Sequence, residues 1–287
     1  MQNAIEICNV CHSFKETEVL KQINLSVKKG EIFGLLGPSG AGKTTLINII
    51  TGQLHPSEGK SIIQGVDSAL LSGDEYKKIG IMMDHFGLYE RMSCYDNLKF
   101  YAKLDGNSND EMKECINRIL KEIALLEVKN RPVAKLSKGM KNRLSFARAI
   151  LRRPDILFLD EPTCGLDPNT TEELHKRILE EKARGTTIFL TTHNMHEAQK
   201  LCDHVALLHE GIIVAYGNPS ELCKKYNHQR RFLIHLKNGE DVELGHERDS
   251  ADTIANYLKN DELETIHTTE PDLETIFMEL TGGKLNQ

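Results

Sequence analysis

A glycine-rich stretch of nine residues, GPSGAGKTT, restricts this chain to a small set of folds. It occupies positions 37–45, between the apolar segments 32–36 and 46–50. That order predicts a strand, a tight loop and a helix, and the spacing G-x-x-x-x-G-K-T is typical of a phosphate-binding loop. Loop amides and the helix N-terminus would face the anion. Lys43 would reach the β- and γ-phosphates of a nucleotide, and the Thr44 hydroxyl would hold Mg²⁺. The expected nucleotide contacts are Gly37, Pro38, Ser39, Gly40, Ala41, Gly42, Lys43, Thr44 and Thr45.

A second strong pattern is the sequence ILFLDEP at positions 156–162. Its continuous apolar run predicts a buried parallel strand. Asp160 and Glu161 follow at its end, and alternation along the strand predicts that the two carboxylates diverge. One could then serve Mg²⁺ and the other a water molecule, whereas the alternative is a solvated acidic turn. Positions 187–191 predict another strand, and His193 at its end could donate a hydrogen bond to a phosphate.

Composition excludes several other classes of protein. The formal net charge of −6 argues against a nucleic-acid surface. No apolar run approaches the roughly 18 residues needed to span a bilayer, and the first ten residues do not resemble a secretory signal. Seven scattered cysteines indicate reduced thiols. We therefore expect a cytosolic chain whose membrane role, if any, comes from a partner.

Two short motifs are rejected as metal or haem sites. The pattern C-x-x-C-H at positions 8–12 matches a c-type haem attachment motif, but haem attachment requires export. It also lies in a strand pattern rather than at the start of a helix, which argues against a redox role. His193 and His196 have no third ligand pattern, so zinc is not expected.

The region before the phosphate-binding loop reads as strands. Positions 4–10 alternate apolar and polar residues and predict an edge strand, and positions 19–27 predict a second strand. Phe14 lies between them and could stack on an adenine ring. The alternative is an ordinary half-buried strand aromatic.

A mainly helical region of about residues 86–150 follows the loop and its helix. It ends in the segment LSKGM, where Ser137 is a plausible N-cap for the next helix. The start of that helix would form a second anion site. On its own, this segment is only a weak indication of an anion site. Its residues are Leu136, Ser137, Lys138, Gly139 and Met140.

Taken in order, these motifs resemble the nucleotide-binding subunit of an ATP-binding cassette (ABC) transporter over about residues 3–217. In that comparison Phe14 matches the adenine-stacking aromatic, and residues 37–45 match the Walker A loop. Asp160 matches the Walker B aspartate that helps to hold Mg²⁺, and Glu161 matches the catalytic glutamate.

Further matches concern positions that the family uses at its protomer interface and its permease contact. Residues 136–140 match the LSGGQ signature, Asp167 the D-loop aspartate, and His193 the switch histidine. Asp84 falls where the family has the Q-loop glutamine, a Mg²⁺ contact. The resemblance implies a head-to-tail dimer with a second ATPase protomer, in which Ser137 and Gly139 bind the γ-phosphate held by the other chain.

Four positions depart from the usual family pattern. Lys138 and Met140 replace a glycine and a glutamine, a variant that is similar to the signature of bacterial drug and antibiotic exporters. Asp84 replaces glutamine, and Cys164 replaces the more common serine. The phosphate-loop lysine, the paired carboxylates and the switch histidine are all retained, so we expect a competent ATPase.

The expected fold class is α/β: a P-loop NTPase ABC cassette with a mainly parallel core sheet, an antiparallel β edge and a helical subdomain at about 86–150. This cassette would occupy residues 1–217. Residues 218–287 predict a small α+β accessory domain with an Asn-Gly hairpin at 238–239. Its last segment, 272–282, resembles the tail of ATPases from bacterial antibiotic, drug and bacteriocin-immunity exporters.

The resemblance implies ATP and Mg²⁺ as ligands and a separate membrane permease as partner, docked near Asp84 and the helical subdomain. The chain would then lie peripherally on the cytoplasmic face of a bacterial membrane, without nucleic acid, haem or zinc. Two alternatives stay open. One is a soluble ABC switch protein of translation or DNA repair, and the other is a low-activity cassette in an asymmetric dimer.

Overall fold

The apolar segment before the phosphate-binding loop is a fully buried strand of a six-stranded sheet. The computed structural model describes residues 3–83, 87–103, 109–227, 231–245, 248–268 and 271–282. These residues divide into two compact units, 1–216 and 217–287. The sheet has the order β10 (Ile212–Gly217), β9 (His204–His209), β3 (Ile32–Leu36), β8 (Thr187–Thr192), β7 (Ile156–Asp160) and β6 (Ile79–Met82).

The strands from β9 to β6 all run parallel. This agrees with the expected α/β class, because apolar runs such as 156–160 are typical of strands covered on both faces. Only β10 follows its neighbour through a short turn, at Glu210 and Gly211, which is the connection of an antiparallel pair.

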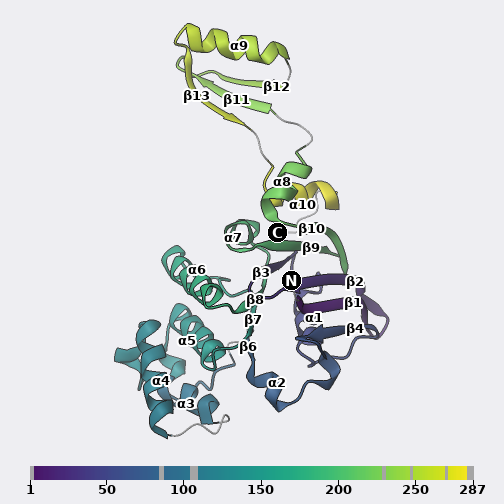
Figure 1. The fold of residues 1–287 in the computed structure, drawn as a ribbon. Helices are drawn as coiled ribbons and strands as arrows, with labels where there is room; N and C mark the ends of the chain where they lie inside the picture. The colour runs from purple at the N-terminus through teal and green to yellow at the C-terminus, as the bar shows by residue number, and fades with distance from the viewer. Residues whose placement is uncertain are drawn as a thin grey trace. The chain divides into compact units, whose positions relative to one another are not determined.

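A second, antiparallel sheet lies on the other side of the first unit from α5 (Lys138–Ile150) and α6 (Pro168–Ala183) in Figure 1. The predicted edge position of the first strand is wrong, because β1 pairs with both β2 and β4. Alternation of apolar and polar residues indicates that one face of a strand is buried, but it does not indicate how many strands pair with it. The sheet has the order β2 (Thr17–Lys28), β1 (Asn3–Phe14), β4 (Glu58–Ile63) and β5 (Val66–Asp67).

Helix α1 (Lys43–Ile50) begins directly after the phosphate-binding loop and shares one hydrophobic cluster with both sheets. Its buried residues Leu46, Ile47, Ile49 and Ile50 belong to the same cluster as Ile5 of β1 and Phe33 of β3. The strand, loop and helix are therefore packed as one block, which holds the loop in place. The short elements η1 (Ser68–Leu70) and α2 (Gly73–Lys77) lead from β5 to β6.

The helical region has its own hydrophobic cluster, which includes Leu98, Ile116, Leu120 and Leu144. Its helix α5 contacts β6 of the parallel sheet. The region contains α3 (Cys94–Lys103), α4 (Asn109–Glu122), η2 (Leu126–Val128), η3 (Val133–Lys135) and α5.

Two helices follow strands of the parallel sheet and have side-chain caps. Helix α6 follows β7 and is capped by Asp167, with Pro168 as its first residue. Helix α7 (Met195–Leu201) follows β8 and is capped by Asn194. Among the described residues, no helix is both long enough and apolar enough to cross a membrane.

The second unit combines a three-stranded antiparallel sheet with helices. The predicted Asn-Gly hairpin is confirmed, because β11 pairs with β12 across a turn in which Gly239 has a φ of +86°. The sheet order is β12, β11, β13. The elements are α8 (Pro219–Lys225), β11 (Arg231–Leu236), β12 (Asp241–Gly245), α9 (Arg248–Lys259), β13 (Leu263–Thr268) and α10 (Leu273–Thr281).

Candidate functional site

The candidate site lies where three neighbouring parallel strands end. Strand β8 lies between β3 and β7, so the carboxyl ends of all three strands meet at one edge of the sheet. The phosphate-binding loop follows β3, the paired carboxylates end β7, and His193 follows β8. Ligands of open α/β sheets bind at this edge.

The backbone of the loop favours glycine at three positions, one of which is Gly40 with a φ of +83°. Gly42 precedes α1 with a φ of +107°, in the left-handed region that disfavours other residues. A Cβ atom at Gly37 would lie 2.2 Å from the carbonyl oxygen of Leu208. Larger residues would move the loop away from the start of α1, where the free amides make an anion site.

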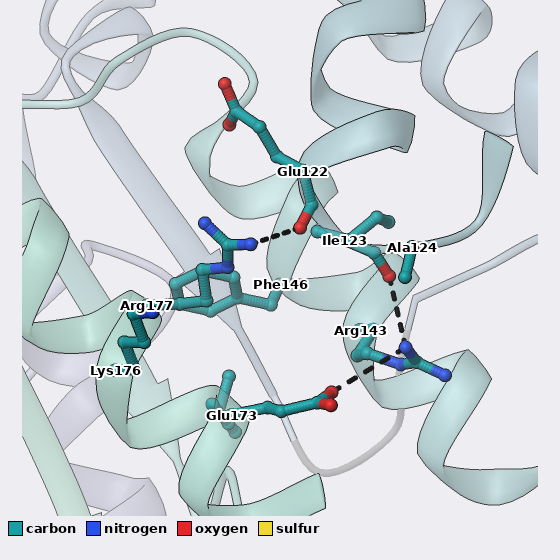
Figure 2. Close-up of a pocket in the computed structure, with 9 residues that line it drawn as sticks. Glu122, Ile123, Ala124, Arg143, Phe146, Glu173, Lys176 and Arg177 are labelled. Atoms are coloured by element: carbon teal, nitrogen blue, oxygen red, sulfur yellow. Dashed lines mark hydrogen bonds and ion pairs between the residues drawn. The ribbon is translucent and has the colours of Figure 1, made fainter.

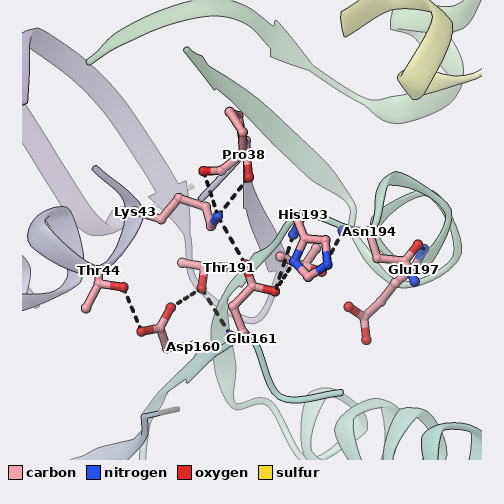
Figure 3. Close-up of polar contacts among 11 residues, drawn as sticks. Pro38, Lys43, Thr44, Asp160, Glu161, Thr191, His193, Asn194 and Glu197 are labelled. Atoms are coloured by element: carbon pink, nitrogen blue, oxygen red, sulfur yellow. Dashed lines mark hydrogen bonds and ion pairs between the residues drawn. The ribbon is translucent and has the colours of Figure 1, made fainter. Parts of the chain in front are cut away.

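Lys43 is buried, and its ammonium group is held in the centre of the site. Its Nζ donates to the carbonyl oxygens of Gly37 at 2.7 Å and Pro38 at 3.2 Å, and lies 3.0 Å from Glu161 Oε1. Figure 3 shows the lysine pointing from the loop towards Glu161. The positive charge therefore lies where phosphate oxygens would bind.

Asp160 is buried between two threonine hydroxyls. Thr44 Oγ1 donates to its Oδ2 at 2.9 Å, and Thr191 Oγ1 donates to its Oδ1 at 2.5 Å. A hydroxyl and a carboxylate oxygen at this separation are ligands that suit Mg²⁺, which prefers oxygen donors and retains several waters. The donor set of Thr44 and Asp160 thus fits the metal expected beside a nucleotide.

Glu161 bridges the lysine and the histidine. Its Oε1 contacts Lys43, and its Oε2 lies 2.8 Å from His193 Nδ1 (Figure 3). Strand β7 ends at Asp160, and Glu161 has a φ of +49°, so its backbone is left-handed. The two carboxylates do diverge, but the cause is this turn in the backbone rather than alternation along a strand.

A cavity of about 380 Å³ lies in front of these residues. Its volume is within the usual range for a small-molecule site. Phe14 is 50% exposed at the cavity wall, and its ring packs edge-on against His12 with 4.6 Å between ring centroids. An exposed aromatic ring is suited to stacking on a nucleobase. The described lining residues are Phe14, Val19, Ser39, Gly40, Gly42, Lys43, Thr44, Thr45, Asp160 and Glu161.

The predicted signature residues lie elsewhere in this chain. Among the described residues that line the cavity, none comes from positions 136–140. Ser137 caps α5, and its Oγ accepts the amide N–H of Met140 at 3.3 Å. The ammonium group of Lys138 lies so close to Gly165 that a Cβ atom on Gly165 would be 2.2 Å from Lys138 Nζ. The first turn of α5 contains no acidic residue, which favours an anion near the start of this helix.

Asp167 is also placed as a helix cap. Its carboxylate accepts the amide N–H of Thr170 at 3.0 Å and the Thr170 hydroxyl at 2.6 Å. These hydrogen bonds lower the pKa of Asp167 below its usual value. The remaining predicted site residue, Asp84, lies outside the described residues.

Two residues that the sequence did not indicate help to hold the carboxylates. Thr191 binds Asp160 and also accepts the amide N–H of Glu161 at 3.3 Å. Asn142 of α5 donates to the carbonyl oxygen of Pro162 at 2.5 Å, which ties the helical region to the segment after Glu161. Thr191 stands out only as a polar residue in an apolar strand, and Asn142 has no such signal, because both contacts depend on the strand order and on helix packing.

A second cavity, of about 190 Å³, separates the end of α4 from α5 and α6 (Figure 2). Arg177 of α6 donates to the carbonyl oxygen of Glu122, and Arg143 of α5 donates to that of Ile123 at 3.3 Å. Arg143 also lies 3.7 Å from Glu173 of α6. Guanidinium groups thus satisfy carbonyls at the C-terminal end of α4, where positive charge is favoured.

Comparisons with known proteins agree with this geometry. The family model described as ABC transporter matches residues 20–164. The fluoroquinolones export ATP-binding protein of Mycobacterium tuberculosis is 39% identical over 93% of this chain and 88% of its own length. The methionine import ATP-binding protein MetN 1 of Listeria monocytogenes is 37% identical over 80% of this chain and 71% of its own length. A solved ATP binding subunit of an ABC transporter has 30% identity and a TM-score of 0.70, covering 78% of this chain and 93% of the other.

Proposed function

The chain belongs to the ABC transporter family of ATP-binding subunits, and from that premise we propose that it powers an exporter whose membrane permease is a separate chain. It binds nucleotide and hydrolyses ATP, as an ABC ATPase. What we add concerns the roles of individual residues, the metal, the second protomer and the direction of transport.

The observation that carries the residue roles is the bridge that Glu161 makes between Lys43 and His193. The γ-phosphate of ATP would replace the Glu161 carboxylate at the ammonium of Lys43, since both are anions. The released carboxylate could then polarise the attacking water, while His193 donates to the γ-phosphate. Thr44 and Asp160 would hold Mg²⁺, which supplies charge neutralisation at the phosphates.

The position of the signature supports a head-to-tail dimer. Ser137 caps α5 and Gly139 is its second residue, neither lines the cavity of its own chain, and the first turn of the helix contains no acidic residue. In a dimer of two such chains these groups would bind the γ-phosphate held by Lys43 of the partner. Closure would then depend on that phosphate, and hydrolysis would open the dimer.

Export is favoured over import by the extent of the similarity. The fluoroquinolone-export relative matches 93% of this chain, which includes most of residues 217–287, whereas the methionine-import relative matches 80%. We therefore assign the chain to an exporter of drugs, antibiotics or peptides, on the cytoplasmic face of a bacterial membrane. The segment 217–287 would be an accessory domain of the exporter subunit.

Lys43→Ala tests the nucleotide site directly. The loss of a charged hydrogen-bond donor, about 1.5 to 3 kcal/mol, should weaken ATP binding about 10- to 150-fold. Equilibrium titration of the full-length chain with ATP measures this, with Lys60→Ala at an exposed position of β4 as the control. Equal affinities for the parent and Lys43→Ala would contradict the assigned site.

The transport proposal needs a separate experiment. Extraction of the tagged full-length chain from its native membranes in mild detergent should recover a polytopic membrane protein. Vesicles that contain the pair should then accumulate a drug or antibiotic only with ATP. Recovery of ribosomes or DNA-repair proteins instead would indicate the soluble switch alternative.

A further inference from the structure

A buried polar contact joins the helix after Asp167 to the helix after His193. His175 lies on α6 and Glu197 on α7, and His175 Nε2 is 2.9 Å from Glu197 Oε1. The two residues are only 6% and 3% exposed. Burial of such groups is unfavourable unless each has a partner. Loss of the contact between them would therefore destabilise the folded protein.

Among the described residues, neither side chain has a second hydrogen-bond partner. In the part of the chain that the structure describes, His175 Nδ1 and Glu197 Oε2 make no hydrogen bond. The nearest further carboxylate, Glu172 Oε2, lies 3.9 Å from His175 Nδ1, beyond hydrogen-bond reach. A shift of α6 along α7 would leave two buried polar groups unpaired, so the contact resists such a shift.

Both residues are close in sequence to a proposed site residue. Asp167 caps α6, two helical turns before His175. His193 immediately precedes Asn194, which caps α7 by accepting the amide N–H of Glu197 at 3.1 Å. Glu197 is thus fixed at its backbone by Asn194 and at its carboxylate by His175. Figure 3 shows Asn194 and Glu197 beside His193.

We propose that His175 and Glu197 are positioning residues that make α6 and the start of α7 move as one body. Asp167 and His193 would then change position together when a second protomer closes on the nucleotide. This inference rests on the roles proposed above for Asp167 and His193. The coupling between Asp167 at the protomer interface and His193 at the γ-phosphate would then depend on these two side chains.

A charged pair on the same two helices provides a matched control. Lys200 Nζ of α7 lies 2.5 Å from Glu172 Oε2 of α6, and the side chains are 50% and 68% exposed. Water and salt screen an exposed pair. Lys200→Ala should therefore leave kcat for ATP hydrolysis within about twofold of the parent value, since exposed pairs contribute little.

The experiment compares His175→Leu, His175→Gln and the double variant His175→Leu/Glu197→Met as full-length chains. A misplaced catalytic group can lower turnover about 100-fold, so His175→Leu should reduce kcat about 10- to 100-fold. The KM for ATP should change less than about twofold, because the cavity residues lie on other elements. His175→Gln keeps a donor for Glu197 and should recover most of kcat.

The double variant separates positioning from stability. It removes the unpaired buried carboxylate, so its melting temperature should return close to that of the parent while kcat stays low. A double variant with parental kcat would overturn the proposal, and so would a kcat loss in Lys200→Ala as large as in His175→Leu. If His175→Leu does not fold, the kcat values of the double variant and of His175→Gln still test the proposal. Parental ATP affinity in Lys43→Ala would instead show that the proposed site itself is wrong.

Discussion

Replacement of Glu161 by glutamine separates the two tasks that the structure gives to this carboxylate. Glutamine keeps the size and the hydrogen-bonding shape of the side chain but has no negative charge. In the structure Glu161 contacts Lys43 at 3.0 Å and His193 at 2.8 Å. The substitution should therefore leave the fold of the site intact and change only its electrostatics.

The first expected effect is on turnover. A general base contributes about 10²- to 10⁴-fold to the rate of a proton-transfer step. Glu161→Gln should lower the rate of phosphate release from ATP by this factor. Closed, ATP-bound dimers should accumulate, because the γ-phosphate that holds the protomers together is not removed.

The second effect is on affinity, and it follows from the contact with Lys43. ATP must displace the Glu161 carboxylate from the ammonium group before its own phosphate can bind there. A hydrogen bond to a charged group is worth about 1.5 to 3 kcal/mol and a neutral one about 0.5 to 1.5 kcal/mol. The competing contact is thus weaker by about 1 kcal/mol in the variant, and ATP should bind about fivefold more tightly.

The assay is equilibrium ATP binding to the full-length chain at a protein concentration too low for dimers, together with steady-state phosphate release. Glu127→Gln, at an exposed position of η2, is the control and should match the parent in both. Parental turnover in Glu161→Gln would refute the assignment of the base. Unchanged or weaker ATP affinity would refute the exchange of carboxylate for phosphate at Lys43.

Three further predictions concern other parts of the chain. Thr191→Val removes the buried hydroxyl that binds Asp160, so the free energy of unfolding in urea should fall by about 1 to 3 kcal/mol. Half-maximal turnover should also require more Mg²⁺, and a Mg²⁺ titration that overlays the parent would contradict this role. Asp84→Ala should lower turnover by on the order of tenfold or more, as expected for a lost positioning contact, while metal-free ATP binding weakens little or even tightens. Identical rates across a Mg²⁺ series would show that Asp84 has no part in the site. A chain that ends at Gly217 contains every described residue of the nucleotide cavity and should bind ATP with parental affinity, whereas loss of cooperative thermal unfolding in that chain would show that residues 218–287 belong to the same folding unit.

Local features of the site could be predicted because their signals are local. The strand before the phosphate-binding loop, the glycine turn and the helix α1 are contiguous, and each has a sequence requirement that is independent of the rest of the fold. The apolar run before Asp160 likewise predicts its own burial.

Features that depend on which elements become neighbours could not be predicted. The role of Thr191 follows from the adjacency of β7 and β8, and the pair His175–Glu197 follows from the packing of α6 against α7. The interior position of β1 requires the pairing of a later strand, β4. The left-handed backbone at Glu161 has no sequence signal, since glutamate is uncommon at positive φ.

The arginine contacts at the end of α4 limit how the helical region can turn. The chain enters this region after β6 and leaves it before β7, and α5 is also attached to the sheet through β6 and through the hydrogen bond from Asn142 to Pro162. Arg177 and Glu173 of α6 add attachments through Glu122 and Arg143. The helical region can therefore pivot only if these bonds break or if α6 turns with it. Guanidinium groups that lie outside the nucleotide cavity therefore contribute to the free-energy barrier to the pivot.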